Sequence, residues 1–275
     1  MRSYALAGPP GVYPERSGGL FTFAGDMFAV ADAEIRKLRH DPLELFMRGV
    51  QPALWLVVFG QVMSRLRGVP TGRLSYFDFM APGILAQSVL FIAIFYGVSA
   101  IRERDLGVLS KYMVSPISRT AMVLGKAISA GVRALSQALI VYVLALLLRI
   151  HVAWEPVNVM GVLALVMMGS AVFSTLSLVI ACIVKSHERI MGMGQVMTMP
   201  LFFASNAIYP LDLMPAWLKS IASVNPLTYE VDGLRALMVQ GGASVHGLGV
   251  DFAVLVGFVA VLVAIATRLY PRLLT

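Results

Sequence analysis

The chain has 275 residues, of which 58% are hydrophobic and only 13% are charged. A soluble domain carries about 25% charged residues, so this chain has too little charge to cover the surface of a soluble protein of its size. The composition excludes an ordinary cytosolic enzyme, a disordered chain and a disulfide-stapled secreted domain. Because a membrane-spanning helix needs about 20 apolar residues, the length accommodates about six spans.

The net charge of +7 does not by itself indicate a nucleic-acid-binding protein. Basic residues of membrane proteins gather in the cytoplasmic loops, which is the simpler explanation in so apolar a chain. The single cysteine, Cys182, lies within an apolar run. It therefore predicts neither an internal disulfide nor a metal site.

The N-terminal region divides into two predicted segments. Residues 1–19 are rich in glycine and proline and lack the continuous apolar core of a signal peptide, so we expect a flexible tail. In residues 20–41 the apolar positions recur at spacings of three and four, with the charged residues off that stripe. This pattern predicts an amphipathic helix in the membrane interface, with packing of its stripe on protein as the alternative.

A membrane domain is predicted from residue 49 to residue 275. Its apolar runs predict six spans, with the first short and broken by Pro52. Most of the 22 lysines and arginines face the cytoplasm if both termini are inside, although three arginines after the first span oppose this orientation. The predicted spans are residues 49–64, 79–101, 121–148, 157–184, 190–209 and 248–267.

The segment between the second and third spans, RERDLGVLSKYMVSPISR, is longer than a minimal connection. Leu106, Leu109 and Met113 are spaced as one face of a short amphipathic helix. Ser115 and Pro116 would end that helix, because a residue before proline avoids the helical conformation. A solvated linker is the alternative interpretation.

The segment after the fifth span, about residues 210–247, is too apolar for a free loop and too interrupted by prolines for a span. Pro215 suits the first turn of a helix. Trp217 and Tyr229 suit the membrane interface. We expect short re-entrant helices that dip into the outer leaflet, with any non-helical backbone there buried in protein or facing water.

These two segments resemble those of the ABC-2 type transporter permeases. RERDLGVLSKYMVSPISR resembles the coupling helix of that family, although Lys111 and Tyr112 depart from its usual pattern. YPLDLMPAWLKSIASVNPLTYEVDGLRALM resembles its outer loop more closely, with the prolines, Trp217, Tyr229 and Arg235 in the family's order. The resemblance covers roughly residues 20–270 and is strongest to daunorubicin-resistance permeases and nodulation-factor exporters.

The resemblance implies an all-α integral membrane protein that is the permease of a bacterial ABC exporter. Such a subunit moves an amphipathic or hydrophobic substrate (a drug, lipid or glycoconjugate) outward by alternating access, as in multidrug export and antibiotic resistance. The chain has no GxxxxGK[ST] phosphate loop, which agrees with ATP hydrolysis by a separate subunit. The chain itself would therefore be no enzyme and hold no cofactor.

The expected partners follow from the same resemblance. Two copies of an ABC ATPase would bind ATP and Mg²⁺, and a second permease, identical or paralogous, would complete the pathway. Membrane lipid is a further partner and nucleic acid is not. The expected location is the inner (cytoplasmic) membrane, with multiple spans and both termini in the cytoplasm.

Three groups of residues are predicted to carry the function, and none is predicted to be catalytic or to bind a metal. The coupling group contacts the ATPase: Arg102, Glu103, Arg104, Asp105, Leu106, Gly107, Leu109, Ser115 and Pro116. The external group forms the re-entrant segment and gate: Tyr209, Pro210, Met214, Pro215, Trp217, Asn225, Pro226 and Tyr229. The substrate-pathway group consists of Phe202, Phe203 and Asn206.

Two other functions compete with this one. A polytopic membrane enzyme acting on lipid-linked substrates needs clustered acids or histidines, whereas the four histidines lie in four separate segments. An ion-coupled transporter places ionisable residues near the midplane, where only Arg133 is a candidate. The small residues Ser170, Ser174, Ser177 and Ala181 predict close helix packing rather than a substrate path.

Overall fold

The computed structural model describes residues 42–65, 72, 74–106, 119–184 and 186–270. The predicted tail, residues 1–19, and the predicted interfacial helix, residues 20–41, lie outside the described residues. The 49–275 boundary of the membrane domain stays a prediction.

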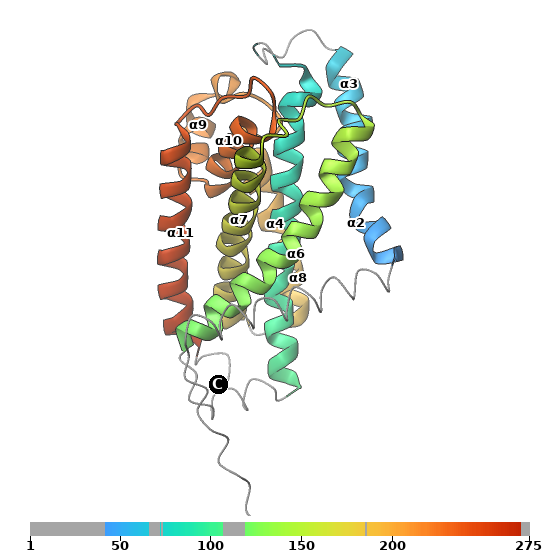
Figure 1. Cartoon of the computed structure of the whole chain (residues 1–275). Helices are drawn as coiled ribbons and strands as arrows, with labels where there is room; N and C mark the ends of the chain where they lie inside the picture. Colours follow the sequence, from blue (N-terminus) through green and yellow to red (C-terminus); the bar gives the residue numbers. More distant parts are fainter. Residues whose placement is uncertain (1–41, 66–71, 73, 107–118, 185, 271–275) are drawn as a thin grey trace, which may run out of the picture.

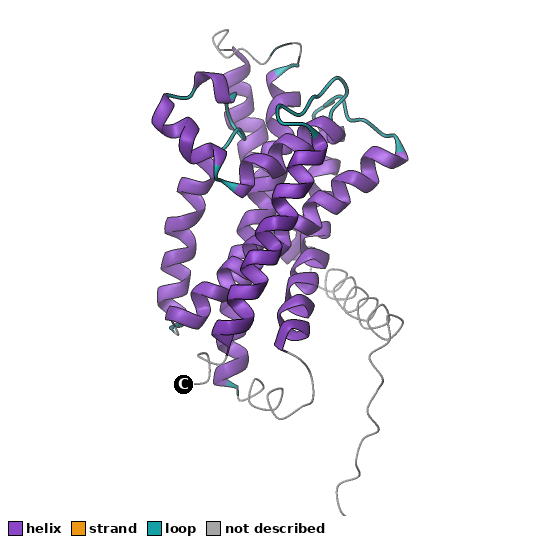
Figure 2. Cartoon of the chain, turned by 90° about the vertical axis from the view of Figure 1, so that its left-hand side faces the viewer, coloured by secondary structure: helices purple, strands orange, loops and turns teal. Residues whose placement is uncertain are grey.

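The described chain is an all-helical bundle whose long helices alternate in direction (Figure 1). It contains no β-strand within the described ranges, and only an isolated bridge joins Val152 to Val239 (Figure 2). The helices are α2 (Pro42–Leu54), the π-helix η1 (Trp55–Phe59), α3 (Gly60–Arg65), α4 (Tyr76–Asp105), α6 (Arg119–Leu147), α7 (Pro156–Val184), α8 (His187–Phe203), the 3-10 helix η2 (Leu211–Leu213), α9 (Ala216–Ser223), α10 (Pro226–Met238) and α11 (Leu248–Leu269).

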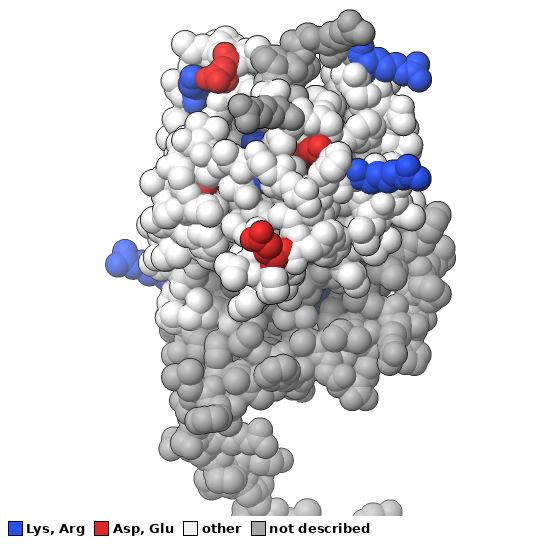
Figure 3. All heavy atoms as spheres, turned by 45° about the horizontal axis from the view of Figure 1, so that its top comes forward, with Lys and Arg blue, Asp and Glu red and all other residues white. Residues whose placement is uncertain are grey.

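The two ends of the bundle differ. The short helices α9 and α10 lie at the end where α3 ends and α4 and α11 begin, and we call this the hairpin end (Figure 1). Helix α4 ends, α6 begins and α7 ends at the opposite end. Charged side chains are few and scattered on the hairpin end, which Figure 3 brings forward.

Four of the described helices are long and apolar enough to cross a membrane, and they make this a multi-pass membrane protein. They coincide with the predicted second, third, fourth and sixth spans, with end points that differ by at most six residues. Their outward faces carry large apolar side chains, such as Leu146 and Val261, which suit a lipid environment. The candidate spans are Tyr76–Phe95, Met122–Leu147, Pro156–Val184 and Leu248–Leu269.

The other two predicted spans differ from the structure. Pro52 does not break the first one, because the chain stays helical from Pro42 to Arg65 and Pro52 is buried inside α2. A π-turn begins at Trp55 instead, and such turns accommodate irregular hydrogen bonding within a helix. The fifth predicted span, residues 190–209, ends six residues early, because α8 stops at Phe203 and the chain then turns.

Helices α4 and α7 form the centre of the bundle. In the most apolar window of α4, 83% of the residues are buried, against 17% in α11 at the periphery. The small residues predicted to pack do so: Ser170, Ser174, Ser177 and Ala181 are all buried. The Ser177 hydroxyl donates to the Ile94 carbonyl and so joins α7 to α4. This confirms helix packing as the role of the stripe.

A second set of small residues on α7 receives α10. Gly161 lies against Leu237, and Gly169 lies against the Glu230 carboxyl, while Leu165 fills the space over Gly233 of α10. Side chains at these glycines would collide with the partner helix, because an added Cβ at Gly169 would lie 2.1 Å from Glu230 Cδ. The glycines therefore allow α10 to pack closely along α7.

Candidate functional site

Helix α10 brings several polar and charged side chains into the protein interior at the hairpin end. Its residues from Pro226 to Arg235 are buried, with Tyr229 half-buried as the exception. Lone charges in such a position are costly unless they find partners. The hydrogen-bond and ionic partners of each side chain therefore show which other elements α10 is attached to.

Asn225 fixes the start of α10. Its Oδ1 accepts a hydrogen bond from the Leu227 amide at 3.0 Å, which is the usual N-cap contact. Its Nδ2 donates to the carbonyls of Leu201 and Ala204 at 2.7 and 2.8 Å. Pro226 occupies the first helical position, where its missing amide costs nothing. One side chain thus caps α10 and ties it to the end of α8.

Arg235 joins α10 to α4 and to the turn after α8. Its guanidinium lies 3.9 Å from the centre of the Phe79 ring and donates to the Phe79 carbonyl at 3.3 Å. A second nitrogen donates to the Asn206 carbonyl at 2.6 Å. Burial lowers the pKa of Arg235 to about 10, while nearby Asp232 opposes the shift, so the group stays charged at neutral pH.

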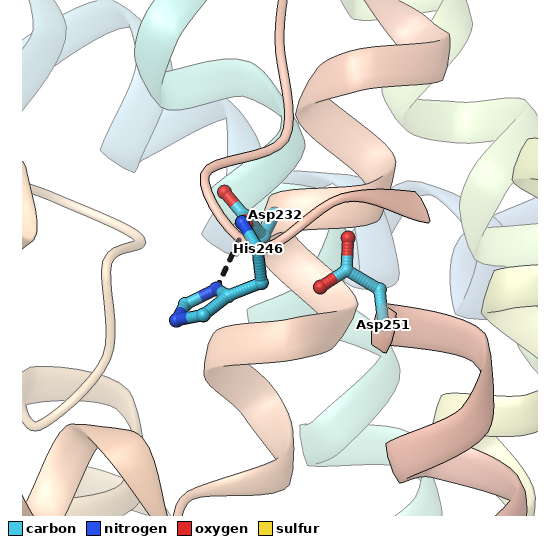
Figure 4. A group of neighbouring side chains, drawn as sticks. All are labelled: Asp232, His246 and Asp251. Atoms are coloured by element: carbon cyan, nitrogen blue, oxygen red, sulfur yellow. Dashed lines mark hydrogen bonds and ion pairs between the residues drawn. The ribbon is translucent and has the colours of Figure 1, made fainter. Parts of the chain in front are cut away.

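Asp232 organises the loop between α10 and α11 (Figure 4). Its Oδ2 accepts from the amides of Val245 and His246 at 2.8 and 3.0 Å, and lies 3.1 Å from His246 Nδ1. The Ser244 hydroxyl lies between two carboxylates, 3.1 Å from Asp232 Oδ2 and 2.7 Å from Asp251 Oδ2. The cluster therefore connects α10, the loop and the first turn of α11.

Glu230 is fully buried, and neither of its carboxyl oxygens has a hydrogen-bond partner among the described residues. The carboxyl packs on the backbone of α7 at Gly169. Burial raises the pKa of Glu230 well above its ordinary value, because the charged form is the one that loses hydration. The neutral acid is the form that fits this position.

A second histidine–aspartate pair lies at the same end. Asp78 of α4 accepts from the His151 amide at 3.0 Å and lies 3.1 Å from His151 Nδ1. The connection between α6 and α7 also bonds to the end of α10, through the amide of Ala153 to Met238 at 2.9 Å and of Gln240 to His151 at 2.9 Å. These contacts hold the two connections of the hairpin end together.

The structure separates the three predicted pathway residues. Phe202 is buried, with its ring 5.4 Å from that of Trp55 in the π-helix, whereas Phe203 is exposed. Asn206 is buried and donates from Nδ2 to Asp232 Oδ1 at 3.4 Å, so it faces protein as expected. Their role in a substrate path stays a prediction.

The predicted external residues lie in and around α9 and α10. The hydroxyl of Tyr209 donates to Phe203, and that of Tyr229 donates to the Ser223 carbonyl at 2.7 Å. Pro215 is the N-cap of α9, while Trp217 in that helix is exposed. Met214 is buried and Pro210 is half-buried.

The predicted coupling residues are described only in part. Helix α4 continues to Asp105, so Arg102, Glu103 and Arg104 extend the span as helix instead of beginning a loop. Asp105 and Leu106 are exposed at the opposite end of the bundle. The side chains of 102–104, and all of Gly107, Leu109, Ser115 and Pro116, lie outside what the structure describes.

Sequence reasoning missed the polar cluster of the hairpin end. It treated the histidines as scattered, although His246 and Asp251 have the spacing HxxxxD at the start of the last span. Asp232 and Arg235, three residues apart in an apolar segment, were a second available signal. The pairing of His151 with Asp78 leaves no local pattern, because 73 residues separate them.

An apolar groove lies between α2, the π-helix and α6. It has a volume of about 730 Å³, and no charged side chain is among the described residues that line it. The lining includes Val50, Leu54 and Val57 on one side, and Leu139 and Val143 on the other. Neither Trp55 nor the predicted pathway residues are among the described residues of this lining, although Trp55 of the same π-helix contacts Phe202.

Comparison with known proteins decides the family. The family model of the ABC-2 type transporters matches residues 26–239. The chain belongs to the ABC-2 type transporter family. This confirms the resemblance inferred from the coupling and outer-loop segments, and it implies association with an ABC ATPase subunit.

Individual relatives of this ABC-2 chain are named as transport permeases or nodulation proteins. It is 26% identical to the transport permease ycf38 of Cyanophora paradoxa, over 79% of this chain and 75% of the relative. It is 26% identical to the daunorubicin resistance permease DrrB1 of Streptomyces coeruleorubidus, over 84% and 81%. It is 24% identical to nodulation protein J of Rhizobium meliloti, over 88% and 87%. The chain is a transmembrane transport permease.

Proposed function

We propose that this chain is the permease subunit of an ATP-driven exporter that moves an amphipathic or hydrophobic substrate outward by alternating access. Two copies of an ABC ATPase bind ATP and Mg²⁺, and two permease chains form the pathway. Six segments cross the cytoplasmic membrane, with α2 to α3 and α8 as the first and fifth. Both termini are cytoplasmic, and α9 and α10 enter the outer leaflet as a re-entrant hairpin.

The apolar groove between α2, the π-helix and α6 is the observation that carries the substrate class. Its volume of about 730 Å³ falls within the range of small-molecule sites, about 300–1,000 Å³. A lining without charge favours an apolar body over a sugar or an ion. The relative named for daunorubicin resistance supports the same class. Membership of the ABC-2 type transporter family opposes the membrane-enzyme alternative, although the acids and histidine that such an enzyme needs do cluster at the hairpin end.

Reconstitution with the ATPase tests the proposed substrate site. Val143→Trp places a large ring in the groove, and we expect it to reduce uptake of an apolar fluorescent drug into inverted vesicles several-fold. The matched control is Val261→Trp on the exposed face of α11, which should transport as the wild type does. Equal transport by the two variants would remove the groove from the pathway.

Coupling is tested at the opposite end of the bundle. Glu103→Ala is expected to leave the ATPase bound and hydrolysing ATP while transport falls, because the side chain is proposed to pair with a charge on the ATPase. The control is Lys219→Ala, which removes an exposed ion pair to Asp212 of 3.6 Å at the hairpin end. Normal transport by Glu103→Ala would exclude that residue from coupling.

The partners are tested by purifying the tagged chain from native membranes in mild detergent and identifying what accompanies it. A near-stoichiometric ATPase carrying a phosphate loop is the expected result, and the presence of a paralogous permease distinguishes a heterodimer from a homodimer. Recovery of the chain alone under several gentle conditions would contradict the proposed assembly.

A further inference from the structure

The side chains of Asp232, His246 and Asp251 converge at the hairpin end from three different elements (Figure 4). Asp232 comes from the middle of α10, His246 from the following loop and Asp251 from the first turn of α11. One nitrogen and two carboxylate oxygens of this group all lie within 4.8 Å of one another. That spacing allows a single ion to contact all three.

The charge of the cluster is not balanced by its neighbours. Asp232 and Asp251 are both fully buried, and Oδ1 of Asp251 has no hydrogen-bond partner among the described residues. Neutral donors face them, namely the Ser244 hydroxyl, the Val245 and His246 amides and the Asn206 side-chain amide, together with the His246 ring. The guanidinium of Arg235 is the nearby fixed charge among the described residues, and its hydrogen bonds go to the carbonyls of Phe79 and Asn206. Two adjacent buried carboxylates therefore have one nearby fixed cation, and a further positive charge would stabilise them.

The donor set indicates which kind of cation fits. Mg²⁺ and Ca²⁺ prefer sites made of oxygen alone. One imidazole nitrogen with two carboxylate oxygens suits Zn²⁺ and its first-row neighbours, and three protein ligands leave a fourth position for water. His246 is partly exposed, with 28% of its side chain accessible, so an ion can reach the site from the surface.

The surroundings hold the ligands in place, as metal sites require. Asp232 is oriented by the Val245 and His246 amides and by the Asn206 amide at 3.4 Å. The His246 ring lies 5.0 Å from that of Tyr229. Gly247 takes a φ of 89°, a conformation that L side chains rarely adopt, and this lets the loop enter α11 beside the cluster.

We propose that Asp232, His246 and Asp251 bind one divalent first-row transition-metal ion, for which Zn²⁺ is the probe. The ion replaces the proton between His246 Nδ1 and Asp232 Oδ2, which lie 3.1 Å apart in the structure. It also provides the partner that Oδ1 of Asp251 lacks among the described residues. Bound metal would connect the loop to α10 and α11 and would restrict the movement of these three elements relative to one another. The proposal does not depend on the transported substrate.

Binding is measured on the purified full-length chain after chelator treatment and removal of the chelator. Titration calorimetry with Zn²⁺ should show one saturable equivalent per chain, and Zn²⁺ should raise the apparent melting temperature. Co²⁺ should produce the visible absorption of a low-symmetry site. Asp251→Asn and His246→Gln, both close in shape to the native residues, should weaken Zn²⁺ binding at least about tenfold.

His151→Gln is the matched control, because it alters the other histidine–aspartate pair of the hairpin end, which has no third ligand among the residues that the structure describes. It should bind Zn²⁺ as the wild type does. Absence of saturable Zn²⁺ binding to the wild type would overturn the proposal, as would equal affinity for Mg²⁺ or an equal loss in the control. The Co²⁺ spectrum of the wild type decides the question even if a variant fails to fold.

Discussion

Gly83 of α4 lies where the turn after α8 comes closest to the helix, and Gly83→Ala tests whether that contact holds the hairpin end together. An added Cβ would lie 2.3 Å from the Ala207 carbonyl oxygen and 2.7 Å from Ala207 Cα. Cβ atoms almost never approach other atoms closer than 3.0 Å. Because the obstructing atoms are backbone, the turn and α4 must move apart instead of a side chain rotating away.

Two opposing effects set the change in the free energy of unfolding. Overpacking a core typically lowers this free energy by about 1–3 kcal/mol and sometimes more, while replacing glycine by alanine within a helix raises it by up to about 1 kcal/mol. We expect the free energy of unfolding to fall by about 2 kcal/mol, which lowers the apparent melting temperature by about 4–8 °C in a chain of this size. The loss should exceed the gain because the clash involves several backbone atoms at once.

The assay is thermal unfolding of the purified protein in detergent, followed by tryptophan fluorescence and by size-exclusion chromatography of heated samples. Gly257→Ala is the control, since this glycine also lies within a helix but has no atom within 4 Å of the added Cβ. It should melt at the wild-type temperature or slightly above. If Gly83→Ala matches the control, the close approach of α4 and the turn is not a stabilising contact.

Variants at three further positions probe contacts of α10 and of α7, each by the same melting assay. Asn225→Ala removes a helix cap and two further hydrogen bonds and should cost about 2–3 kcal/mol of unfolding free energy. Asn225→Asp keeps the cap but places a carboxylate oxygen against the Leu201 and Ala204 carbonyls, so it should destabilise the protein at least as much. Glu230→Gln keeps the shape and removes an ionisable group without a partner, so it should raise the melting temperature at pH 8; a fall would reveal a partner for the carboxyl. Ser177→Ala deletes the hydrogen bond to Ile94 and should cost about 1 kcal/mol, so an unchanged melting temperature would contradict its role in joining α4 and α7.

The sequence predicted those parts of the fold that depend on local patterns. Four apolar runs became helices with nearly the predicted bounds, because length and hydropathy alone decide that a segment must satisfy its hydrogen bonds internally. The helix beginning near Pro215 also follows from neighbours along the chain, and the stripe of small residues that includes Ser177 is itself a local pattern. The sequence shows such patterns directly, although the helix that Ser177 packs against lies far away along the chain.

Other features depend on contacts that no local pattern records. Pro52 suggested an interruption, but the surrounding bundle buries it and the backbone adjusts through the π-turn at Trp55. Residues 204–209 are apolar enough for a span, yet the hydrogen bonds that Asn225 donates to the carbonyls of Leu201 and Ala204 hold the end of α8. The burial of Asp232 depends on a loop that folds back from residues 244–246.

The anchoring of α10 limits how the transporter can move. Its side chains bond to α4, to the end of α8 and, through Ser244, to the start of α11, and the backbone at its end bonds to the α6–α7 connection. We therefore expect that the hairpin does not move as an independent lid. Opening at this end would have to carry α10 together with α4 and α7 as one rigid body. No such polar bonds lie among the described residues that line the apolar groove beside α2 and α6. We therefore expect the helices to separate along this groove.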